Sequence, residues 1–267
     1  MSGRAALKYL ALWVGVVGFA ACAQRGPAAP AARAALRVAV PAETPPYSFR
    51  QEGQLVGLEI DFARELAAAL GRPLEILEFD WRDLIPAVRS GRADVIMAGM
   101  TITQARQVLI AFSDPYLRSG LLAVTRREDA ARFQSVKSVL ATAEPIGIVE
   151  GTTADRFVRE NARLASVSPY PTVLSAIREL RQRRVTLVVH DAPVAIWFAA
   201  GDEANLAPLL ELLNQEDLGW AMRQDDQTLR ADVNAVLAGW RTDGTRDRIL
   251  GRWIPYWQRL ESGTARR

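Results

Sequence analysis

The first half of the chain alternates short apolar runs with segments in which apolar residues recur at helical spacing. Runs at 36–40 and 74–79 predict strands, and residues 59–70 and 81–88 predict amphipathic helices. A short, fully apolar strand follows at 95–98. This order of strand, helix, strand, helix and strand predicts a parallel sheet flanked by helices.

The ends of these two helices carry local signals. Gly71 and Gly91 are placed to end them, because glycine accepts the left-handed conformation that commonly follows a helix. Asp80 can cap the second helix, and Asp83 is in place to complete a pair that resembles a capping box. We therefore expect two regular helices that begin and end at these residues.

The same pattern starts again in the second half of the chain. A strand is predicted at 145–149, helices at 152–164 and 173–183, and a buried strand at 185–189 that is followed by a helix at 192–200. The C-terminal part is predicted to be helical. Two units of this kind predict an α/β protein with two lobes rather than one continuous sheet.

The N-terminus has the pattern of an export signal. Arg4 and Lys8 precede an apolar run at 9–19, which is shorter than the roughly 20 residues of a membrane-spanning helix. Two alanines and Cys22 follow, and this ending looks like the lipobox at which bacterial lipoprotein precursors are lipidated and cleaved. We expect residues 1–22 to be a lipoprotein signal peptide. The alternatives are an uncleaved membrane anchor and an ordinary signal peptide with an incidental cysteine.

The composition excludes an internal disulfide and gives no sign of nucleic-acid binding. Cys22 is the only cysteine, so the folded part cannot contain an internal disulfide. Residues 23–35 are rich in alanine and proline and predict a flexible tether. The formal net charge is +3, and removal of Arg4 and Lys8 with the signal leaves +1. Arginines are interspersed with acids and form no basic stripe, so nucleic-acid binding is not predicted.

Polar residues follow the predicted strand at 95–98. Ligands of open α/β sheets bind outside the carboxyl ends of the strands. Here Gly99 exposes a backbone amide, Thr101 offers a hydroxyl, and Arg106 can form a bidentate contact with a carboxylate. The alternative is that Thr103 caps a helix and that Arg106 is a solvated surface residue.

Two further strand ends carry polar residues. Thr152 and Thr153 lie where a strand meets a helix N-terminus, where free N–H groups suit an anion, although simple capping explains them equally well. Asp191 could bind an ammonium group or cap the next helix. His190 is the only histidine, and the sequence lacks the motifs of a catalytic triad, a His-rich metal site or a dinucleotide-binding loop. We predict no metal and no cofactor.

Several segments together resemble those of one known family. These segments are 57–66, 81–88, 91–94, 99–103 with Arg106, 112–116, 150–153, 190–191 and 243–245. Over residues 36–258 their order and spacing are similar to those of amino-acid-binding proteins of ABC transporters, in the polar-amino-acid branch. The resemblance implies the type II periplasmic-binding-protein fold, in which two α/β lobes are joined by two hinge crossovers and the ligand cleft lies between them. Lobe 1 would comprise 36–119 and 218–260, lobe 2 would comprise 120–217, and 261–267 would be a tail.

The resemblance also assigns roles around the ligand's backbone. Arg106 and Thr101, with the backbone of Gly99, would bind the α-carboxylate. Asp191, on the other lobe, would bind the α-ammonium group. A zwitterion costs several kcal/mol to desolvate unless each of its charges finds a partner, and opposite charges on opposite walls would meet this requirement.

Other residues would complete the cleft by the same resemblance. Thr152 and Thr153 would add hydrogen bonds from the second lobe. Trp81 and Tyr47 would form apolar walls for the ligand's side chain, and Glu43 would lie near the polar end of that side chain.

The predicted function is an exported, monomeric binding protein, lipid-anchored to a membrane through Cys22, that delivers a polar amino acid to an ABC transporter permease. It would need no cofactor and would not be an enzyme. Glu43 and Glu150 near the cleft would favour a ligand with a cationic side chain. Two alternatives stay open: an enzyme on the same fold that resembles cyclohexadienyl dehydratase, with Glu150 as general acid or base, and a sensory ligand-binding module.

Overall fold

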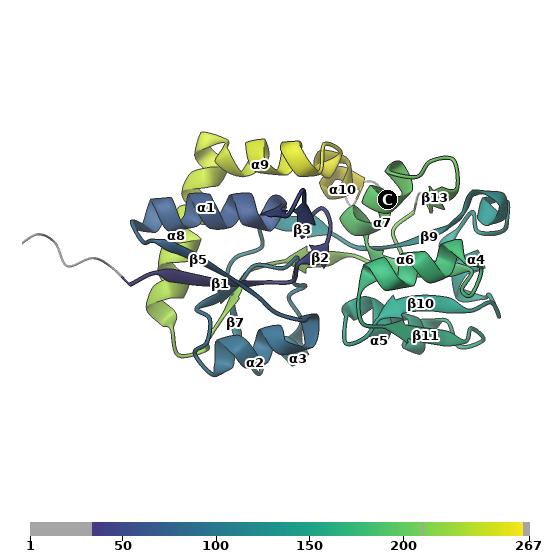
Figure 1. The fold of residues 1–267 in the computed structure, drawn as a ribbon, viewed down its shortest axis with the longest axis horizontal. Helices are drawn as coiled ribbons and strands as arrows, with labels where there is room; N and C mark the ends of the chain where they lie inside the picture. Colours follow the sequence, from purple (N-terminus) through teal and green to yellow (C-terminus); the bar gives the residue numbers. More distant parts are fainter. Residues whose placement is uncertain (1–33, 210, 264–267) are drawn as a thin grey trace, which may run out of the picture. The chain divides into compact units, whose positions relative to one another are not determined.

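The computed structural model describes residues 34–209 and 211–263 (Figure 1). The strands of its first sheet follow the order β5-β1-β6-β15-β7 and are β1 (Leu36–Val40), β5 (Leu74–Glu78), β6 (Val95–Ile96), β7 (Ala111–Phe112) and β15 (Ala221–Met222). β1 runs parallel to β5 and β6, as predicted, whereas β15 runs antiparallel to β6 and β7. The sheet is therefore mixed. Its antiparallel strand, β15, comes from a distant part of the chain.

The helices of this first lobe are α1 (Leu58–Leu70), α2 (Leu84–Arg89), α3 (Gln104–Gln107), α8 (Gln227–Asp243) and α9 (Thr245–Trp253). α1 and α2 lie on opposite sides of the sheet (Figure 1). α1 ends at Gly71, which has the left-handed conformation (φ 61°), as predicted. The expected capping box is wrong: Asp80 makes no side-chain cap bond, and Trp81–Asp83 form a short 3-10 helix, η1. The Asp83 N–H donates instead to the Asp80 carbonyl oxygen at 2.9 Å, so α2 begins only at Leu84.

A small antiparallel sheet that the hydrophobic pattern did not predict connects β1 to α1. It contains β2 (Glu43–Thr44), β3 (Ser48–Gln51) and β4 (Gln54–Val56). The turn between β2 and β3 is attached to the start of α1, because Leu58 N–H donates to the Pro46 oxygen and Glu59 N–H to the Tyr47 oxygen, both at 2.9 Å. These bonds determine where Tyr47 lies.

The second sheet follows the order β11-β10-β12-β9-β13, with strands β9 (Leu121–Arg126), β10 (Ile146–Val149), β11 (Val167–Tyr170), β12 (Leu187–Asp191) and β13 (Leu206–Pro208). β10 is parallel to β11 and β12, and β9 is antiparallel to β12 and β13. The helical segments of this second lobe are η2 (Arg127–Arg132), α4 (Val136–Leu140), α5 (Thr153–Asn161), α6 (Val173–Arg181) and α7 (Ala192–Ala200).

Two extended segments join the lobes. β8 (Leu117–Ser119) leads from β7 of the first sheet into β9 of the second, and β14 (Glu216–Leu218) leads back from β13 to β15. The two segments pair antiparallel, with Leu117 opposite Leu218 and Ser119 opposite Glu216. Two α/β lobes joined by two crossovers confirm the predicted fold.

The lobes also contact each other away from the crossovers. Trp197 of α7 lies 5.3 Å from Phe49 of β3 and 6.5 Å from Trp253 of α9, measured between ring centroids. The Tyr256 hydroxyl donates to the Pro193 carbonyl oxygen in the first turn of α7, at 3.3 Å. α7, which begins directly after Asp191, is therefore held by residues of the first lobe.

The two ends of the described chain are attached to the folded part. Arg72 donates hydrogen bonds to the carbonyl oxygens of Ala34 and Ala35, the last two residues of the expected tether. At the other end, α10 (Trp257–Gly263) continues past the residue at which the tail was expected to begin. Trp257 and Leu260 are buried in the core, which explains why the helix persists there.

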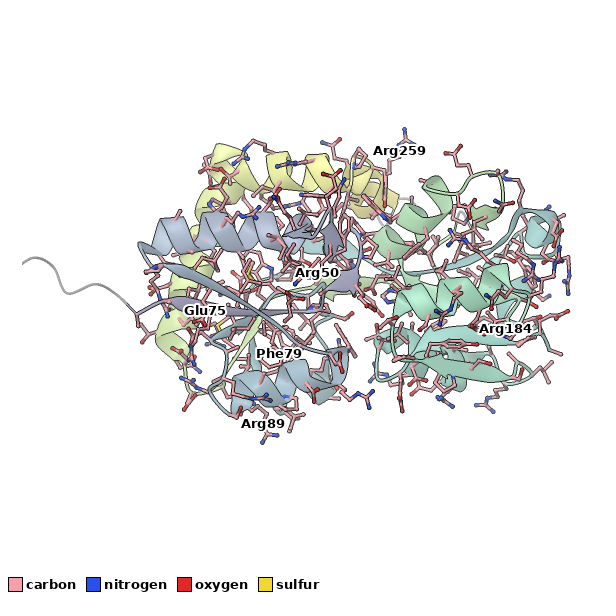
Figure 2. The ribbon with its side chains drawn as sticks, viewed as in Figure 1. Arg50, Glu75, Phe79, Arg89, Arg184 and Arg259 are labelled. Carbon is pink, nitrogen blue, oxygen red and sulfur yellow. The ribbon has the colours of Figure 1, made fainter. Side chains whose placement is uncertain are left out.

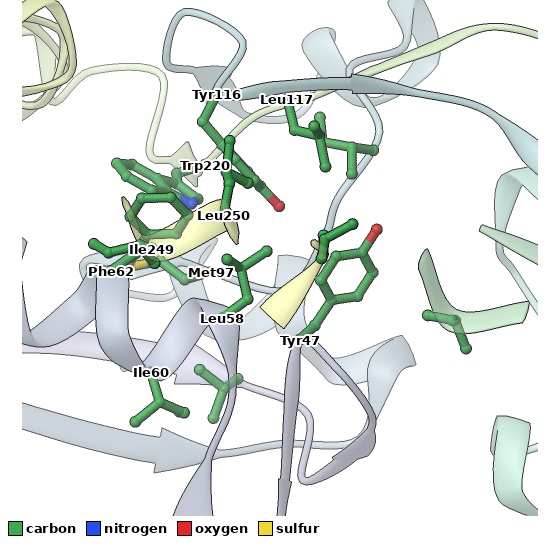
Figure 3. Close-up of a cluster of buried hydrophobic side chains, with 14 of the residues drawn as sticks. Tyr47, Leu58, Ile60, Phe62, Met97, Tyr116, Leu117, Trp220, Ile249 and Leu250 are labelled. Atoms are coloured by element: carbon green, nitrogen blue, oxygen red, sulfur yellow. The ribbon is translucent and has the colours of Figure 1, made fainter. Parts of the chain in front are cut away.

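An aromatic cluster fills the core of the first lobe beside α1. Figure 3 shows Phe62, Tyr116 and Trp220 packed together, with centroid distances of 5.5 Å from Phe62 to Tyr116 and 5.3 Å from Tyr116 to Trp220. Trp240 of α8 stacks on Phe62 at 5.8 Å. Fully burying a side chain such as Phe62 contributes roughly 1.5–3 kcal/mol. The cluster therefore anchors the N-terminal part of α1, which supports one wall of the site.

Charged side chains are spread over the surface. Arg89, Arg184 and Arg259 extend outward from separate parts of the fold (Figure 2). Many arginines pair with acids, for example Arg184 with Glu179. Among the described helices, none combines the length and apolar character needed to cross a membrane.

Candidate functional site

A cavity of about 230 Å³ lies between residues of the two lobes. The predicted site residues that line it are Glu43, Trp81, Gly99, Thr101, Arg106, Thr152, Thr153 and Asp191. Tyr47 is the predicted site residue that does not line it. The cavity is smaller than the roughly 300–1,000 Å³ of sites for drug-sized ligands, which suits a molecule of the size of an amino acid.

Arg106 is held in position by its own short helix and by the strand end before it. Thr103 caps α3 by accepting the Arg106 N–H at 3.2 Å, so the expectation of a helix cap is correct for that residue. The Arg106 side chain is not a solvated surface group: it is partly buried, Nη1 donates to the Thr101 carbonyl oxygen at 2.9 Å, and the guanidinium lies 5.4 Å from the Trp81 ring centroid. Burial lowers the pKa of Arg106, and the nearby negative charges of Asp191 and Glu216 oppose that effect.

Asp191 occupies the N-cap position of α7 but does not cap it with its side chain. Its backbone N–H donates instead to His190 Nδ1 at 2.8 Å. Burial raises the pKa of Asp191 well above its ordinary value, Glu216 raises it further, and Arg106 lowers it. Asp191 lines the cavity, and its Oδ2 lies 3.6 Å from His190 Nδ1.

Arg106 and Asp191 line the same cavity without neutralising each other. In residues 34–209 and 211–263, no ion pair within 4.0 Å joins Arg106 to any acid or Asp191 to any lysine or arginine. A guanidinium from the first lobe and a carboxyl group from the second thus line one cavity. This arrangement is complementary to a small molecule with both a negative and a positive group.

The backbone N–H groups of Gly99 and Thr101 differ in their hydrogen bonding. The Gly99 N–H donates to Glu59 Oε1 at 2.7 Å, so it is not free to bind a carboxylate, and this part of the prediction is wrong. Thr101 forms an antiparallel bridge with Leu218 in which the flanking residues make the hydrogen bonds. In such a pair the N–H and C=O groups of Thr101 point away from the partner strand. Its C=O meets Arg106 on that side, and the N–H points the same way without a hydrogen bond to any residue in 34–209 or 211–263.

Tyr47 lies in the core rather than in the cavity wall. It is fully buried, and its ring packs so closely under Gly99 that a Cβ at Gly99 would meet Tyr47 Cε2 at 2.3 Å. Gly99 also has a positive φ of 62°, so both its conformation and the close ring require glycine. Burial raises the pKa of the Tyr47 hydroxyl well above its ordinary value. The predicted role of Tyr47 as a wall for the ligand is therefore corrected: it supports Gly99 from below.

Trp81 reaches across the cleft. Its Nε1 donates to the Gly151 carbonyl oxygen of the second lobe at 3.3 Å, while its ring lies beside Arg106. Glu43 is exposed at the edge of the cavity, whereas Glu150 lines a neighbouring hollow that also contains Trp81 and Gly151. Of the two acids expected near the ligand, Glu43 thus lines the cavity and Glu150 does not.

The two threonines at the start of α5 have different roles. Thr152 is the N-cap: its Oγ1 accepts the Asp155 N–H at 3.2 Å and donates to the Val149 oxygen at 2.7 Å. The capping explanation is therefore correct for Thr152. Thr153 is buried, and its hydroxyl donates to Glu216 Oε2 at 3.0 Å.

Two acids that the sequence did not single out organise this region. Glu59 is fully buried and accepts hydrogen bonds from Gly99 N–H at 2.7 Å, from the Tyr116 hydroxyl at 2.6 Å and from Trp220 Nε1 at 2.9 Å. Burial raises its pKa to about 6, and these three bonds oppose that effect. A signal was present, because Glu59 shares the apolar face of α1 at helical spacing. Glu216, on a short crossover strand, had no such signal.

His190 should make stability depend on pH. Burial lowers its pKa from 6.5 to about 4, so the stability that it contributes is complete above pH 6.5 and is lost as the pH falls toward 4. We expect wild type to lose on the order of 3 kcal/mol over this range relative to His190→Asn, whose side-chain oxygen can still accept the Asp191 N–H. Urea unfolding of both proteins at pH 7.5 and 4.5 measures the difference.

The variant His190→Asn must be compared with wild type at each pH, because other groups also change the pH dependence of stability. Glu59 acts in the opposite direction, since its raised pKa makes its contribution fall as the pH rises from 4.5 to about 6. His190 is the only histidine, so no other imidazole titrates in this range. An equal pH dependence in the two proteins would contradict the assignment of a buried, neutral His190.

Two lobes that place a basic and an acidic side chain in one shared cavity are typical of a solute-binding protein. The chain belongs to the bacterial extracellular solute-binding proteins, family 3, whose family model matches residues 36–256. It is 26% identical over 223 residues to the L-cystine-binding protein TcyJ of Escherichia coli, covering 83% of each chain. It is also similar to the structure of an ancestral arginine-binding protein bound to arginine, with 33% identity and a TM-score of 0.78 over 83% of this chain and 99% of that one.

An enzyme is among the relatives. The cyclohexadienyl dehydratase of Pseudomonas aeruginosa is 30% identical over 158 residues, which is 59% of this chain and 59% of the dehydratase. The family thus consists mainly of binding proteins but also includes a catalyst on the same framework.

Proposed function

We propose that this chain binds an amino acid between its two lobes and delivers it to an ABC transporter permease. The observation that carries the proposal is that Arg106 of the first lobe and Asp191 of the second line one cavity without an ion pair between them. Membership of a family with amino-acid-binding members supports it.

The ligand's backbone would be held by both lobes at once. Its α-carboxylate would bind the Arg106 guanidinium and the free N–H of Thr101 in the first lobe, and its α-ammonium group would bind Asp191 in the second. Each charge is costly to bury without a partner, so only the closed form satisfies both. A ligand that binds the closed form better shifts the equilibrium toward closure. The Trp81 bond to Gly151 forms part of the same closed arrangement.

The ligand's side chain is proposed to be cationic. The acids Glu43, Glu78 and Asp80 line the cavity together with Asp191, and within residues 34–209 and 211–263 Arg106 is the one lysine or arginine that does so. Glu78 pairs with Arg50, which leaves Glu43 and Asp80 without an ion pair among the described residues. A cationic side chain would compensate these charges, and the similar ancestral protein binds arginine.

The location of the protein is proposed from its N-terminus. Residues 1–22 would be a lipoprotein signal peptide and Cys22 the lipidated residue, both outside the described residues. The tether at 23–35 would let a monomeric binding domain reach a permease in the membrane. The proposed lobes are 36–119 with 218–260, and 120–217, a division that agrees with the strands of the two sheets.

A thermal-shift panel on residues 23–267 tests the proposal. A ligand at a hundredfold over its Kd adds about 2.7 kcal/mol to the stability of the folded state, which raises the Tm by several degrees at roughly 2–4 °C per kcal/mol. We expect L-arginine and L-lysine to give the largest shifts, neutral amino acids smaller ones, and L-glutamate none. If no amino acid on the panel raises the Tm, the proposed function is wrong.

The second candidate is a dehydratase, and the similar enzyme of Pseudomonas aeruginosa is the reason to test it. Glu150, the acid expected to act as general acid or base, is exposed and lies outside the cavity that holds Arg106 and Asp191. We therefore expect no product when the protein is incubated with prephenate or arogenate. Product formation above that of an Asp191→Asn variant would favour the enzyme.

A further inference from the structure

The Glu216 carboxylate lies where the returning crossover passes between the lobes. It is buried, and its Oε2 accepts the hydroxyl of Thr101 at 2.7 Å and the hydroxyl of Thr153 at 3.0 Å. Its Oε1 accepts Asn214 Nδ2 at 3.0 Å. Thr101 follows β6 of the first lobe and Thr153 begins α5 of the second. One carboxylate therefore connects residues of both lobes at the crossover.

These bonds determine the direction of two hydroxyl protons. A hydroxyl has one proton, and a carboxylate only accepts hydrogen bonds. The two hydroxyl oxygens also lie 3.4 Å apart, but both are closer to Glu216 Oε2, at 2.7 and 3.0 Å. With both protons directed to the carboxylate, any further hydrogen bond of either hydroxyl must be one that it accepts. Both threonines line the cavity, whereas Glu216 is not among the residues that line it.

We infer that Glu216 is a positioning residue for ligand binding, which turns the hydroxyls of Thr101 and Thr153 into acceptors for ligand N–H groups and joins the lobes in the closed form. The role of the two hydroxyls in binding a ligand rests on the proposed function. The role of Glu216 in joining the lobes does not. The hydroxyl of Thr101 then serves the ligand's nitrogen rather than its carboxylate, which is left to Arg106 and the Thr101 N–H. The negative charge of Glu216 also adds to that of Asp191 in attracting a cation.

Glu216→Gln is the first test, because the side chain keeps its shape while one acceptor becomes a donor. If the new NH₂ group faces Asn214 Nδ2, two donors meet. If it faces the threonines, it donates to them and releases their protons toward the cavity. The first orientation places two donors together and is therefore disfavoured, so we expect the second. The threonine hydroxyls then no longer accept from the ligand, and the Kd for L-arginine should rise about tenfold, the effect of losing one hydrogen bond to a charged group.

The double variant Asn214→Asp with Glu216→Gln reverses the polarity of the bond between these two side chains. The new carboxylate at position 214 can accept from the new NH₂ group at position 216 and still accept the Leu121 N–H that Asn214 Oδ1 accepts at 2.8 Å. The new amide oxygen at position 216 then faces the two threonines, and the net charge equals that of wild type. We expect the double variant to recover most of the affinity for L-arginine that Glu216→Gln loses.

Asp217→Asn is the matched control, since it removes the same charge one residue further along β14. The Asp217 side chain is half exposed, and among the described residues its one charged partner is Arg118, at 3.9 Å. We expect this variant to bind L-arginine as wild type does. Circular dichroism and thermal unfolding of all variants confirm that they are folded.

A readout without ligand tests the link between the lobes separately. Amide hydrogen exchange in 117–119 and 216–218 should be faster in Glu216→Gln than in wild type and slow again in the double variant. If wild type does not bind L-arginine, the proposed ligand class fails while this exchange experiment still tests the link. Wild-type affinity together with wild-type exchange in Glu216→Gln would overturn the inference, as would a double variant no better than Glu216→Gln.

Discussion

Replacing Arg106 with alanine is expected to abolish the binding of amino acids at micromolar concentration. The substitution leaves the ligand's carboxylate in a closed cavity without its cationic partner, and truncating one member of a buried charge pair costs about 2–5 kcal/mol. This cost corresponds to a rise in Kd of roughly 30-fold to several thousandfold. Isothermal titration with the amino acid that gives the largest thermal shift measures it directly.

The chain offers a control of the same residue type. Arg82 is exposed on η1 beside Trp81, lines only the neighbouring hollow, and forms no ion pair among the described residues. Arg82→Ala removes the same charge near the cleft and should change the Kd little. If Arg106→Ala bound as well as Arg82→Ala, the guanidinium would not hold the ligand and the proposed site would be wrong.

Replacing Glu59 with alanine is expected to cause the largest loss of stability of any variant discussed. Three buried donors, from Gly99, Tyr116 and Trp220, would lose their acceptor. Each unsatisfied buried group costs about 1–3 kcal/mol, so we expect a loss on the order of 4 kcal/mol. At roughly 2–4 °C per kcal/mol, the Tm should fall by about 10 °C, which calorimetry can measure.

Glu65 on the same helix provides the comparison for Glu59. It pairs with Arg248 at 3.1 Å on the surface, where such pairs contribute about 0–1 kcal/mol. Glu65→Ala should therefore leave the Tm almost unchanged. A similarly small change for Glu59→Ala would show that the network under Gly99 is not structurally important. Because Glu59 lies behind the cavity wall, its loss should also disturb the strand end that carries Thr101.

The regular elements with strong apolar periodicity were predictable because local sequence determines them. α1 and α7 begin and end within one residue of their predicted limits, and β1 matches its prediction. The capping box at Asp80 and Asp83 failed because a backbone bond closes that turn instead. The sheet of β2, β3 and β4 was missed because its strands have only two to four residues and no clear alternation.

The candidate site residues at the ends of strands could be predicted from the sequence, whereas the contacts behind the cavity wall could not. Asp191 ends β12 and Arg106 lies in the segment after β6, and the general rule for α/β folds locates ligand-binding residues at such strand ends. Tyr47 was assigned to the cavity by resemblance, but the turn bonded to α1 places its ring under Gly99. The prediction for the Gly99 N–H failed because its partner, Glu59, lies 40 residues away in the chain.

The amino-acid sequence by itself determined the type and order of the main helices and strands, the polar strand ends and the family to which the chain belongs. Hydrophobic periodicity and local motifs depend only on neighbouring residues, so they can be recognised in an unfolded chain. Only the tertiary structure decided which donors are already occupied and which charges face one another without pairing. Those properties depend on contacts such as Glu216 with Thr101, 115 residues apart, which form only when both lobes and both crossovers are in place.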